Sequence, residues 1–166
     1  SLKNSREQYR LLAERSSDVV WVLDLETGRF RYISPSVHRL RGFTAEEVMD
    51  QTLEEVMTPT SLAYVQSILP QKIEAFNRGE SSSSTEQFEQ IRKDGSSVWT
   101  ESVMSLTLNK ETGHIEAIGA SRNITARKKV QDALIDANKQ LTEAVAQARA
   151  ANRAKAEFLA NMSHEI

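Results

Sequence analysis

Apolar residues follow two different spacings along residues 19–124, and these spacings predict strands on both sides of a helical block. β-branched and aromatic residues dominate residues 19–23 and 30–33, and a Glu-Thr-Gly turn joins the two runs, so a hairpin is expected. Three further runs of this kind occupy residues 85–92, 98–108 and 115–124, separated by Lys-Asp-Gly and Glu-Thr-Gly turns. The pattern predicts one antiparallel sheet of five strands.

Helix signals fill the interval between the second and third strands. Pro35 suits the first turn of a short helix that Gly42 ends, and residues 44–47 (Thr-Ala-Glu-Glu) form a capping box for another. A longer helix is expected between Thr58-Pro59 and Gly79, with Pro70 kinking or dividing it. Residues 2–15 also have amphipathic helical spacing. We therefore expect an α+β fold with the helices on one face of the sheet.

Residues 125–166 contain no Gly or Pro and eleven alanines, which predicts one helix about 60 Å long. A stripe of apolar residues follows alternating steps of four and three, if Lys155 is counted as the interrupting member. Its members are Val130, Leu134, Ala137, Leu141, Ala144, Ala148, Ala151 and Phe158. This spacing is typical of a parallel coiled coil with a phase break, so we expect a homodimer through residues 125–166. The alternative is an amphipathic helix that folds back on the sheet.

The last twelve residues, KAEFLANMSHEI, place one histidine opposite an apolar stripe. The apolar side consists of Phe158, Leu159, Met162 and Ile166. At about 100° per residue, His164 points almost directly away from their mean direction. A free imidazole is a good nucleophile near neutral pH, and Glu165 could hydrogen-bond one of its ring nitrogens. The alternative is that His164 is simply a polar residue on a solvated helix.

Composition excludes several classes of function. The formal net charge is −2, without the basic excess of a nucleic-acid-binding protein. The chain has no cysteine, which excludes disulfides, thiolate metal sites and cysteine-based flavin photochemistry. No apolar run approaches the roughly 20 residues of a membrane span. We expect a cytoplasmic fragment of a longer protein, since no initiator Met is present, and leave membrane attachment of the parent open.

The string FLANMSHEI resembles the phospho-acceptor box of sensor histidine kinases. The resemblance implies that His164 accepts a phosphoryl group from ATP and that Glu165 assists as base or hydrogen-bond partner. It also implies that the helix forms half of a dimeric four-helix bundle. The match ends at Ile166, before the arginine, threonine and proline that normally follow.

Four longer strings resemble successive landmarks of a PAS domain, a sensory module with a five-stranded sheet. They are YRLLAERSSDVVWVLDLETGRFRYISPSV, LRGFTAEEVMDQTL, IRKDGSSVWTE and GASRNITARKK. Asn123, Ile124 and Thr125 occupy the position where this family couples the last strand to the next helix. The family usually has Asp at the position of Asn123. An asparagine can cap a helix, but it cannot form the charged pair that is usual at this position.

No ligand of the sensor is evident from the sequence. Haem-binding relatives place an axial histidine on the long helix, but residues 59–79 contain none. His38 and His114 are expected at the surface, and the three histidines are too scattered to predict a metal site. The pocket candidates are Trp21, Met49, Phe76, Phe88 and Met104, each of which could equally be plain core. We expect neither haem nor flavin, and the stimulus stays open.

Together these features predict the sensor and signal-transmission fragment of a two-component histidine kinase. Its expected parts are a PAS domain over residues 1–124, a signalling coiled coil over 125–154 and the start of the phospho-acceptor helix over 155–166. In the parent, a separate ATP-binding domain with ATP and Mg²⁺ would phosphorylate His164, and the phosphoryl group would pass to an aspartate of a response regulator. The fragment alone should be inactive. The alternative is a non-catalytic dimerisation module with an inert His164, and a fused cyclic-nucleotide synthase is disfavoured by the histidine box.

Overall fold

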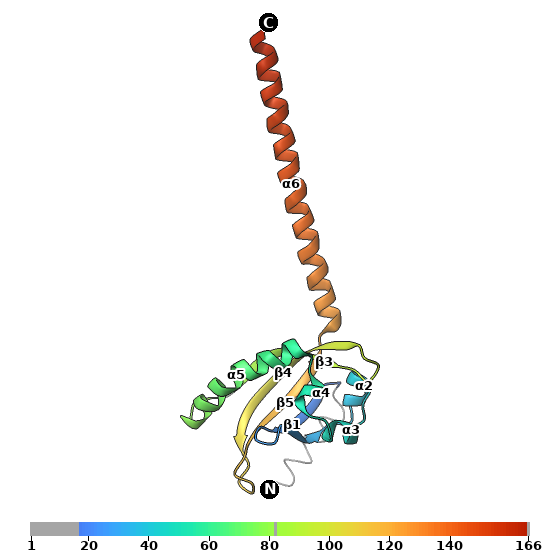
Figure 1. The fold of residues 1–166 in the computed structure, drawn as a ribbon, viewed down its shortest axis with the longest axis vertical. Coiled ribbons are helices and arrows are strands. Elements are labelled where there is room, and N and C mark those ends of the chain that lie inside the picture. Colours follow the sequence, from blue (N-terminus) through green and yellow to red (C-terminus); the bar gives the residue numbers. More distant parts are fainter. Residues whose placement is uncertain (1–16, 82, 166) are drawn as a thin grey trace. The chain divides into compact units, whose positions relative to one another are not determined.

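A computed structural model of the chain describes residues 17–81 and 83–165. The chain divides into two units, Ser1–Thr125 and Ala126–Ile166, and Figure 1 shows the order of the elements by colour. The first unit holds a sheet and four helices, α2 to α5, within its described part. The helix predicted over residues 2–15 lies outside the described residues.

The sheet contains the five predicted strands. They are β1 (Val19–Asp24), β2 (Arg29–Ile33), β3 (Ser84–Ile91), β4 (Ser97–Leu108) and β5 (Ile115–Asn123). The order across the sheet is β2-β1-β5-β4-β3, and every neighbouring pair is antiparallel. The last strand therefore lies in the middle of the sheet, so the chain leaves the sheet from its central strand. The fold predicted from the sequence is confirmed.

Four helices separate β2 from β3: α2 (Val37–Arg41), α3 (Ala45–Met49), α4 (Leu53–Val56) and α5 (Pro59–Asn77). The predicted helix start and stop signals are present. Gly42 ends α2 with a φ of 81°, and Thr44 caps α3 in a capping box with Glu47. The sequence analysis missed α4. Its signal repeats that of α3, because Thr52 precedes Glu55 by three residues and its backbone N–H donates to the Glu55 carboxylate over 2.8 Å.

Of the two outcomes expected at Pro70, a kink or a division of the helix, the division is wrong, because α5 continues through Pro70 to Asn77. A proline inside a helix leaves the carbonyl four residues earlier without its usual donor. That residue, Gln66, is exposed, so water can bind the free carbonyl. The helix therefore tolerates the proline on its solvent side.

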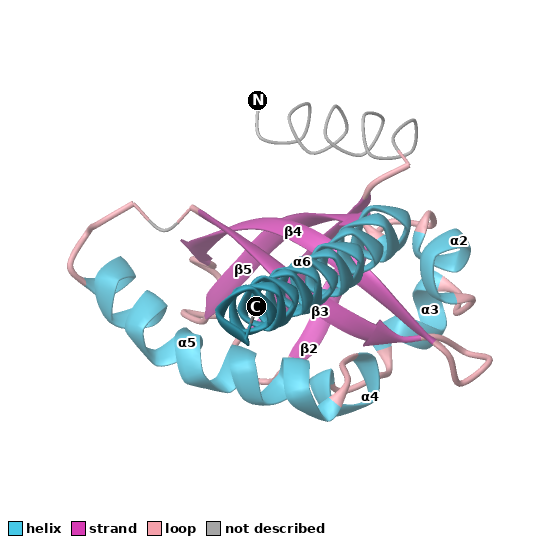
Figure 2. Cartoon of the chain, turned by 90° about the horizontal axis from the view of Figure 1, so that it is seen from above, coloured by secondary structure: helices cyan, strands magenta, loops and turns pink. Residues whose placement is uncertain are grey.

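The core lies between the inner face of the sheet and the helices that cover it, and Figure 2 shows α4 and α5 on the same side of the sheet. Trp21 is central to this core, with its indole edge-on to Phe30 at 6.2 Å between ring centroids. Gly119 on β5 makes room for the indole, because a Cβ there would lie 2.5 Å from Trp21 Cζ2. The glycine thus fixes where the tryptophan can lie.

The second unit is the helix α6 (Thr125–Glu165), 41 residues long, as the sequence predicts. None of its residues is buried. Among the described helices of both units, none is long and apolar enough to cross a membrane.

Candidate functional site

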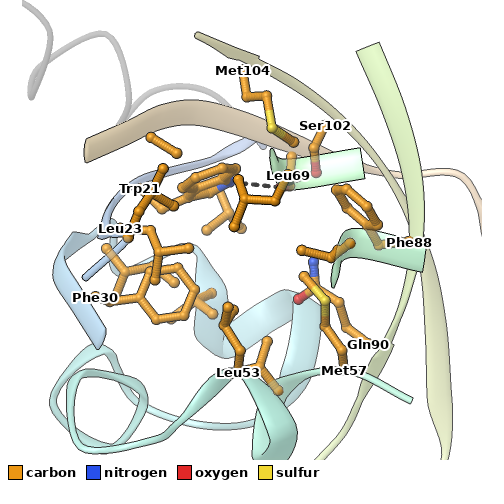
Figure 3. Close-up of a pocket in the computed structure, with 18 of the residues that line it drawn as sticks. Trp21, Leu23, Phe30, Leu53, Met57, Leu69, Phe88, Gln90, Ser102 and Met104 are labelled. Carbon is orange, nitrogen blue, oxygen red and sulfur yellow. Dashed lines mark hydrogen bonds between the residues drawn. The ribbon is translucent and has the colours of Figure 1, made fainter. Parts of the chain in front are cut away.

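A cavity of about 70 Å³ lies inside the first unit, between the sheet and the helices (Figure 3). Most of its lining is apolar, and Figure 3 shows side chains from β1, β2, α4, α5, β3 and β4 around a common space. Of the five pocket candidates, Trp21, Phe88 and Met104 line the cavity. Met49 and Phe76 lie outside the lining and pack against the main core cluster.

Most polar groups in the lining have partners within the protein. The indole N–H of Trp21 donates to Ser121 Oγ over 2.8 Å, and that hydroxyl lies 2.7 Å from Ser102 Oγ. The Gln90 side chain donates to Thr100 Oγ1 over 3.0 Å. These bonds tie β1, β3, β4 and β5 together beneath the cavity, so its sheet side is a satisfied polar network.

Arg41 is the exception, and the sequence analysis did not single it out. It is 1% exposed, although it belongs to the cavity lining. Its Nε donates to the Ile91 carbonyl over 2.8 Å and its Nη1 to Gln51 Oε1 over 3.2 Å, but its Nη2 is buried without a partner among the described residues. Burial lowers the pKa of Arg41 to about 10.

His114, which the sequence predicts at the surface, is partly buried and paired with two carboxylates. Its side chain is 29% exposed, with Nδ1 2.8 Å from Asp24 Oδ2 and Nε2 3.1 Å from Glu26 Oε2. The hydrogen bond with Asp24 raises the pKa of His114, and the same bond lowers the pKa of Asp24. The pair forms because β1 and β5 are neighbours, which brings the turn before β5 beside the end of β1.

The remaining histidine of this unit, His38, is exposed as expected. The described residues contain no cluster of His, Cys, Asp or Glu that could hold a metal ion.

The three predicted coupling residues lie where β5 leads into α6. Asn123 Oδ1 accepts a hydrogen bond from the Thr125 backbone N–H over 2.9 Å, as expected of a capping residue. Ile124 is buried, and its N–H donates to the Trp99 carbonyl over 2.9 Å. A charged pair also exists beside this position, because Arg122 binds the Asp18 carboxylate through Nε at 3.2 Å and Nη2 at 3.1 Å.

His164 and Glu165 are exposed near the end of α6. Within the described residues, no hydrogen bond joins the two side chains. Neighbouring residues on a helix project about 100° apart, which explains why they do not face each other. Phe158, Leu159 and Met162 are exposed on the same helix. The imidazole and the apolar stripe are thus both accessible, on opposite sides of one helix.

Three comparisons with known proteins bear on the first unit. The family model described as PAS fold matches residues 7–124. The comparison with curated proteins gives no match.

Solved structures share the fold at low sequence identity. A sensory box histidine kinase/response regulator from Burkholderia thailandensis E264 is 20% identical over 82% of this chain and 98% of its own, with a TM-score of 0.61. A PAS domain from Colwellia psychrerythraea is 22% identical over 74% of this chain and 98% of its own, with a TM-score of 0.59. The N-terminal domain of a diguanylate cyclase with PAS/PAC sensor from Marinobacter aquaeolei is 18% identical over 67% of this chain and 98% of its own, with a TM-score of 0.51. At these identities the likeness concerns the fold alone.

Proposed function

Because the chain belongs to the PAS family, we propose that it is the sensor and signal-transmission part of a two-component histidine kinase. The sensor is the first unit, α6 carries the signal, and His164 is the phospho-acceptor. The observation that carries this proposal is the combination on one uninterrupted helix of an exposed apolar stripe and an exposed histidine on the opposite side, inside FLANMSHEI.

The apolar stripe of α6 requires a partner. Val130, Leu134 and Leu141 are 70%, 60% and 63% exposed. An isolated helix has little stability in water unless its apolar face packs against another surface. While this stripe is exposed, the helix lacks the free energy that burying its apolar side chains would contribute. The four-three spacing fits the same stripe of a second copy in a parallel coiled coil. The proposed active form is therefore a homodimer through residues 125–166.

The proposed chemistry takes place at the imidazole of His164. One ring nitrogen attacks the γ-phosphorus of ATP, a nitrogen–phosphorus bond forms, and the bond between that phosphorus and the β–γ bridging oxygen breaks to release ADP. The phosphoryl group then passes to an aspartate of a response regulator, which restores His164. ATP and Mg²⁺ are assigned to a separate ATP-binding domain of the parent.

Glu165 is proposed to assist this step once the partner domain is docked. In the structure it is exposed and not bonded to His164, so its carboxylate is available to accept a hydrogen bond from a ring N–H after a side-chain rotation. Such a bond fixes the tautomer whose other nitrogen is free to attack.

The signal path follows from the chain itself. Only Ile124 separates the end of β5 from the start of α6, and both neighbours of Ile124 take part in hydrogen bonds at this exit. A rearrangement of the sheet can therefore reach His164 only by rotating, tilting or shifting the paired helices.

The second candidate is a dimerisation module in which His164 is inert. It is kept because PAS sensors of similar fold come from both a histidine kinase and a diguanylate cyclase, so the fold does not decide the output. Acid-labile phosphate in the parent that disappears in His164→Gln supports the kinase. Absence of acid-labile phosphate from the parent supports the inert module, whereas unchanged phosphate in that variant shows that another residue is the acceptor.

A further inference from the structure

A surface hollow of about 340 Å³ lies where α2 ends beside the turn between β3 and β4. Five basic residues and one acidic residue line what we call the basic hollow: His38, Arg39, Arg41, Arg92, Lys93 and Asp94. Small-molecule sites typically enclose about 300–1,000 Å³, so the basic hollow can hold a small organic ligand. Among the described residues of its lining, only Gly42 has no polar side chain, so a ligand that fits there is polar.

The two segments that line the basic hollow are fixed against each other. The Lys93 backbone N–H donates to the Arg41 carbonyl over 2.9 Å, which joins the turn to α2. Gly42 leaves room for this approach, because a Cβ on it would lie 3.3 Å from Lys93 Cβ. Within the turn, the Asp94 carboxylate accepts from the Ser96 N–H over 2.9 Å and from the Ser96 hydroxyl over 2.6 Å. Because the lining is ordered in advance, a ligand binds there with little further loss of conformational freedom.

The basic hollow carries more positive charge than the nearby carboxylates neutralise. Lys93 Nζ lies 2.7 Å from Glu47 Oε1, so this lysine is already paired. Asp94 supplies the other negative charge. With His38 counted as neutral, four positive charges in the lining face these two negative charges. Two positive charges are left uncompensated, and their potential attracts a dianion.

Arg92 is the side chain most directly available to an anion. It lines the basic hollow and does not line the core cavity. Its Nε is buried without a hydrogen-bond partner, and its guanidinium forms no hydrogen bond or ion pair with any residue that the structure describes. Arg39 is exposed and equally unpaired within residues 17–81 and 83–165. Both guanidinium groups therefore keep N–H groups that no protein acceptor occupies.

The end of a helix explains only part of this charge. Basic residues stabilise the C-terminal end of a helix through its dipole, and the last turn of α2 contains His38, Arg39 and Arg41. Arg92 follows β3 and belongs to a turn between strands, so the dipole of its own element does not account for it. A ligand that contacts both segments gives a reason for unpaired arginines on each of them.

We propose that the basic hollow binds a small phosphate monoester, whose phosphate group bonds the guanidinium groups of Arg92 and Arg39 and whose polar body fills the rest of the hollow. A phosphate monoester carries a charge of about −1.5 to −2 at pH 7, which matches the two uncompensated positive charges. The planar guanidinium is well suited to bidentate bonds with phosphate oxygens. Arg41 is 1% exposed, so it contributes charge rather than an accessible contact. That this ligand is a stimulus rests on the proposed kinase function, whereas its binding does not.

The test is an NMR titration of the 166-residue chain at about pH 7.5, where a phosphate monoester is mostly dianionic. Glucose 6-phosphate should shift the backbone amide signals of residues 38–42 and 92–95 with a dissociation constant at or below about 1 mM. Inorganic phosphate should shift the same signals with weaker affinity, because it lacks the polar body. Glucose 6-sulfate has a similar shape but a single negative charge, so it should bind about tenfold or more weakly than the phosphate. Glucose should not bind.

Substitutions separate the guanidinium contacts from a general effect of charge. Arg39→Gln and Arg92→Gln should each weaken the binding of glucose 6-phosphate by about tenfold or more. The control is Arg78→Gln, which removes a positive charge at the end of α5 and should leave binding unchanged. Asp94→Asn keeps an acceptor for Ser96 and removes the acidic member of the lining, so it should tighten binding by about threefold or more.

Four results would overturn the proposal. They are no shift of these signals with either phosphate, equal binding of glucose 6-phosphate and glucose 6-sulfate, unchanged binding by Arg39→Gln, and shifts centred on the Trp21 indole N–H of the core cavity instead of the basic hollow. Because Arg39 is exposed, Arg39→Gln supports the comparison even if Arg92→Gln fails to fold. Failure here leaves phosphorylation of His164 untouched, which separates this proposal from the kinase proposal.

Discussion

Trp99 and Thr125 are hydrogen-bonded at the point where the sheet ends, with the Trp99 backbone N–H donating to Thr125 Oγ1 over 3.3 Å. The Trp99 carbonyl accepts from the N–H of Ile124 over 2.9 Å. The two backbone groups of Trp99 thus bind Ile124, the residue before α6, and Thr125, its first residue. We expect a shift of β4 to reach the first residue of α6 through these two hydrogen bonds.

Thr125→Val tests this connection, because it keeps the shape of the side chain and removes the acceptor. We expect the free energy of unfolding of the first unit to fall by about 0.5–1.5 kcal/mol, the usual contribution of one hydrogen bond. Thr125→Ser retains the hydroxyl, so its free energy of unfolding should fall by less than that of Thr125→Val. Urea denaturation followed by tryptophan fluorescence measures both variants. If Thr125→Ser and Thr125→Val lower the free energy of unfolding equally, the methyl group rather than the hydrogen bond contributes the stability at this position.

The ion pair between His114 and Asp24 predicts how the stability of the first unit depends on pH. The pKa of His114 is raised in the folded state, so its contribution is complete below the unfolded value of about 6.5 and is lost as pH rises through the folded pKa. The pKa of Asp24 is lowered, so its contribution is present above about 3.9 and is lost as pH falls through the folded pKa. Stability from this pair is therefore greatest between about pH 4 and pH 6.5.

Other charged side chains surround the His114–Asp24 pair and also contribute to the pH dependence of stability. Arg31 lies 3.8 Å from Asp24 Oδ2 and 3.2 Å from Glu116 Oε1, and Glu26 lies on the far side of the imidazole. Melting temperatures at pH 6 and pH 8 should show a decrease that His114→Gln removes and that His38→Gln, at an exposed site, leaves in place. An equal decrease in His114→Gln would assign the pH dependence to other groups.

Local signals in the sequence were sufficient for most of the fold. Turn residues, the capping box at Thr44 and the break at Gly42 each act within a few residues, so they could be identified before the strands were paired. The same reasoning would have found α4, since Thr52 and Glu55 repeat the box. The tolerance of Pro70 depended on which side of α5 faces solvent, which only the packed structure shows.

The features of the candidate site that the sequence did not predict depend on residues from separate elements of the fold. His114 and Asp24 are 90 residues apart, and their contact depends on β1 and β5 being neighbours in the sheet. Arg41 was not recognised because the partners of its guanidinium, Gln51 and the Ile91 carbonyl, lie 10 and 50 residues further along the chain. His164, by contrast, was identified from the sequence through a local motif, and its chemical role stays a prediction.

The proposed dimer is tested by charging one position of the apolar stripe of α6. Leu134→Lys places a charge in the predicted coiled-coil interface, whereas Ile135→Lys, equally exposed at 61% against 60%, lies about 100° away. Sedimentation should show a dimer for the unmodified chain, a weakened dimer for Leu134→Lys and a nearly unchanged one for Ile135→Lys. If both variants associate alike, the stripe is not the interface.

Transmission along α6 predicts a dependence on helical phase. One residue inserted between Val130 and Ala151 rotates everything after it by about 100°, whereas seven residues nearly restore the phase. Autophosphorylation of the parent should change by about tenfold or more, up or down, with one inserted residue, and should stay close to the original with seven. Indifference to the length of the insert would make the helix a passive tether.

The most direct measurement is the site and chemistry of phosphorylation in the parent kinase incubated with Mg²⁺ and ATP labelled at the γ-phosphate. The account predicts label that is acid-labile and alkali-stable, mapped by mass spectrometry to the peptide containing His164. It should be absent from His164→Gln but present in His38→Gln. Since His164 is solvent-exposed, His164→Gln should fold and dimerise like the parent. Label that persists in His164→Gln, or that maps to another residue, would contradict the central claim.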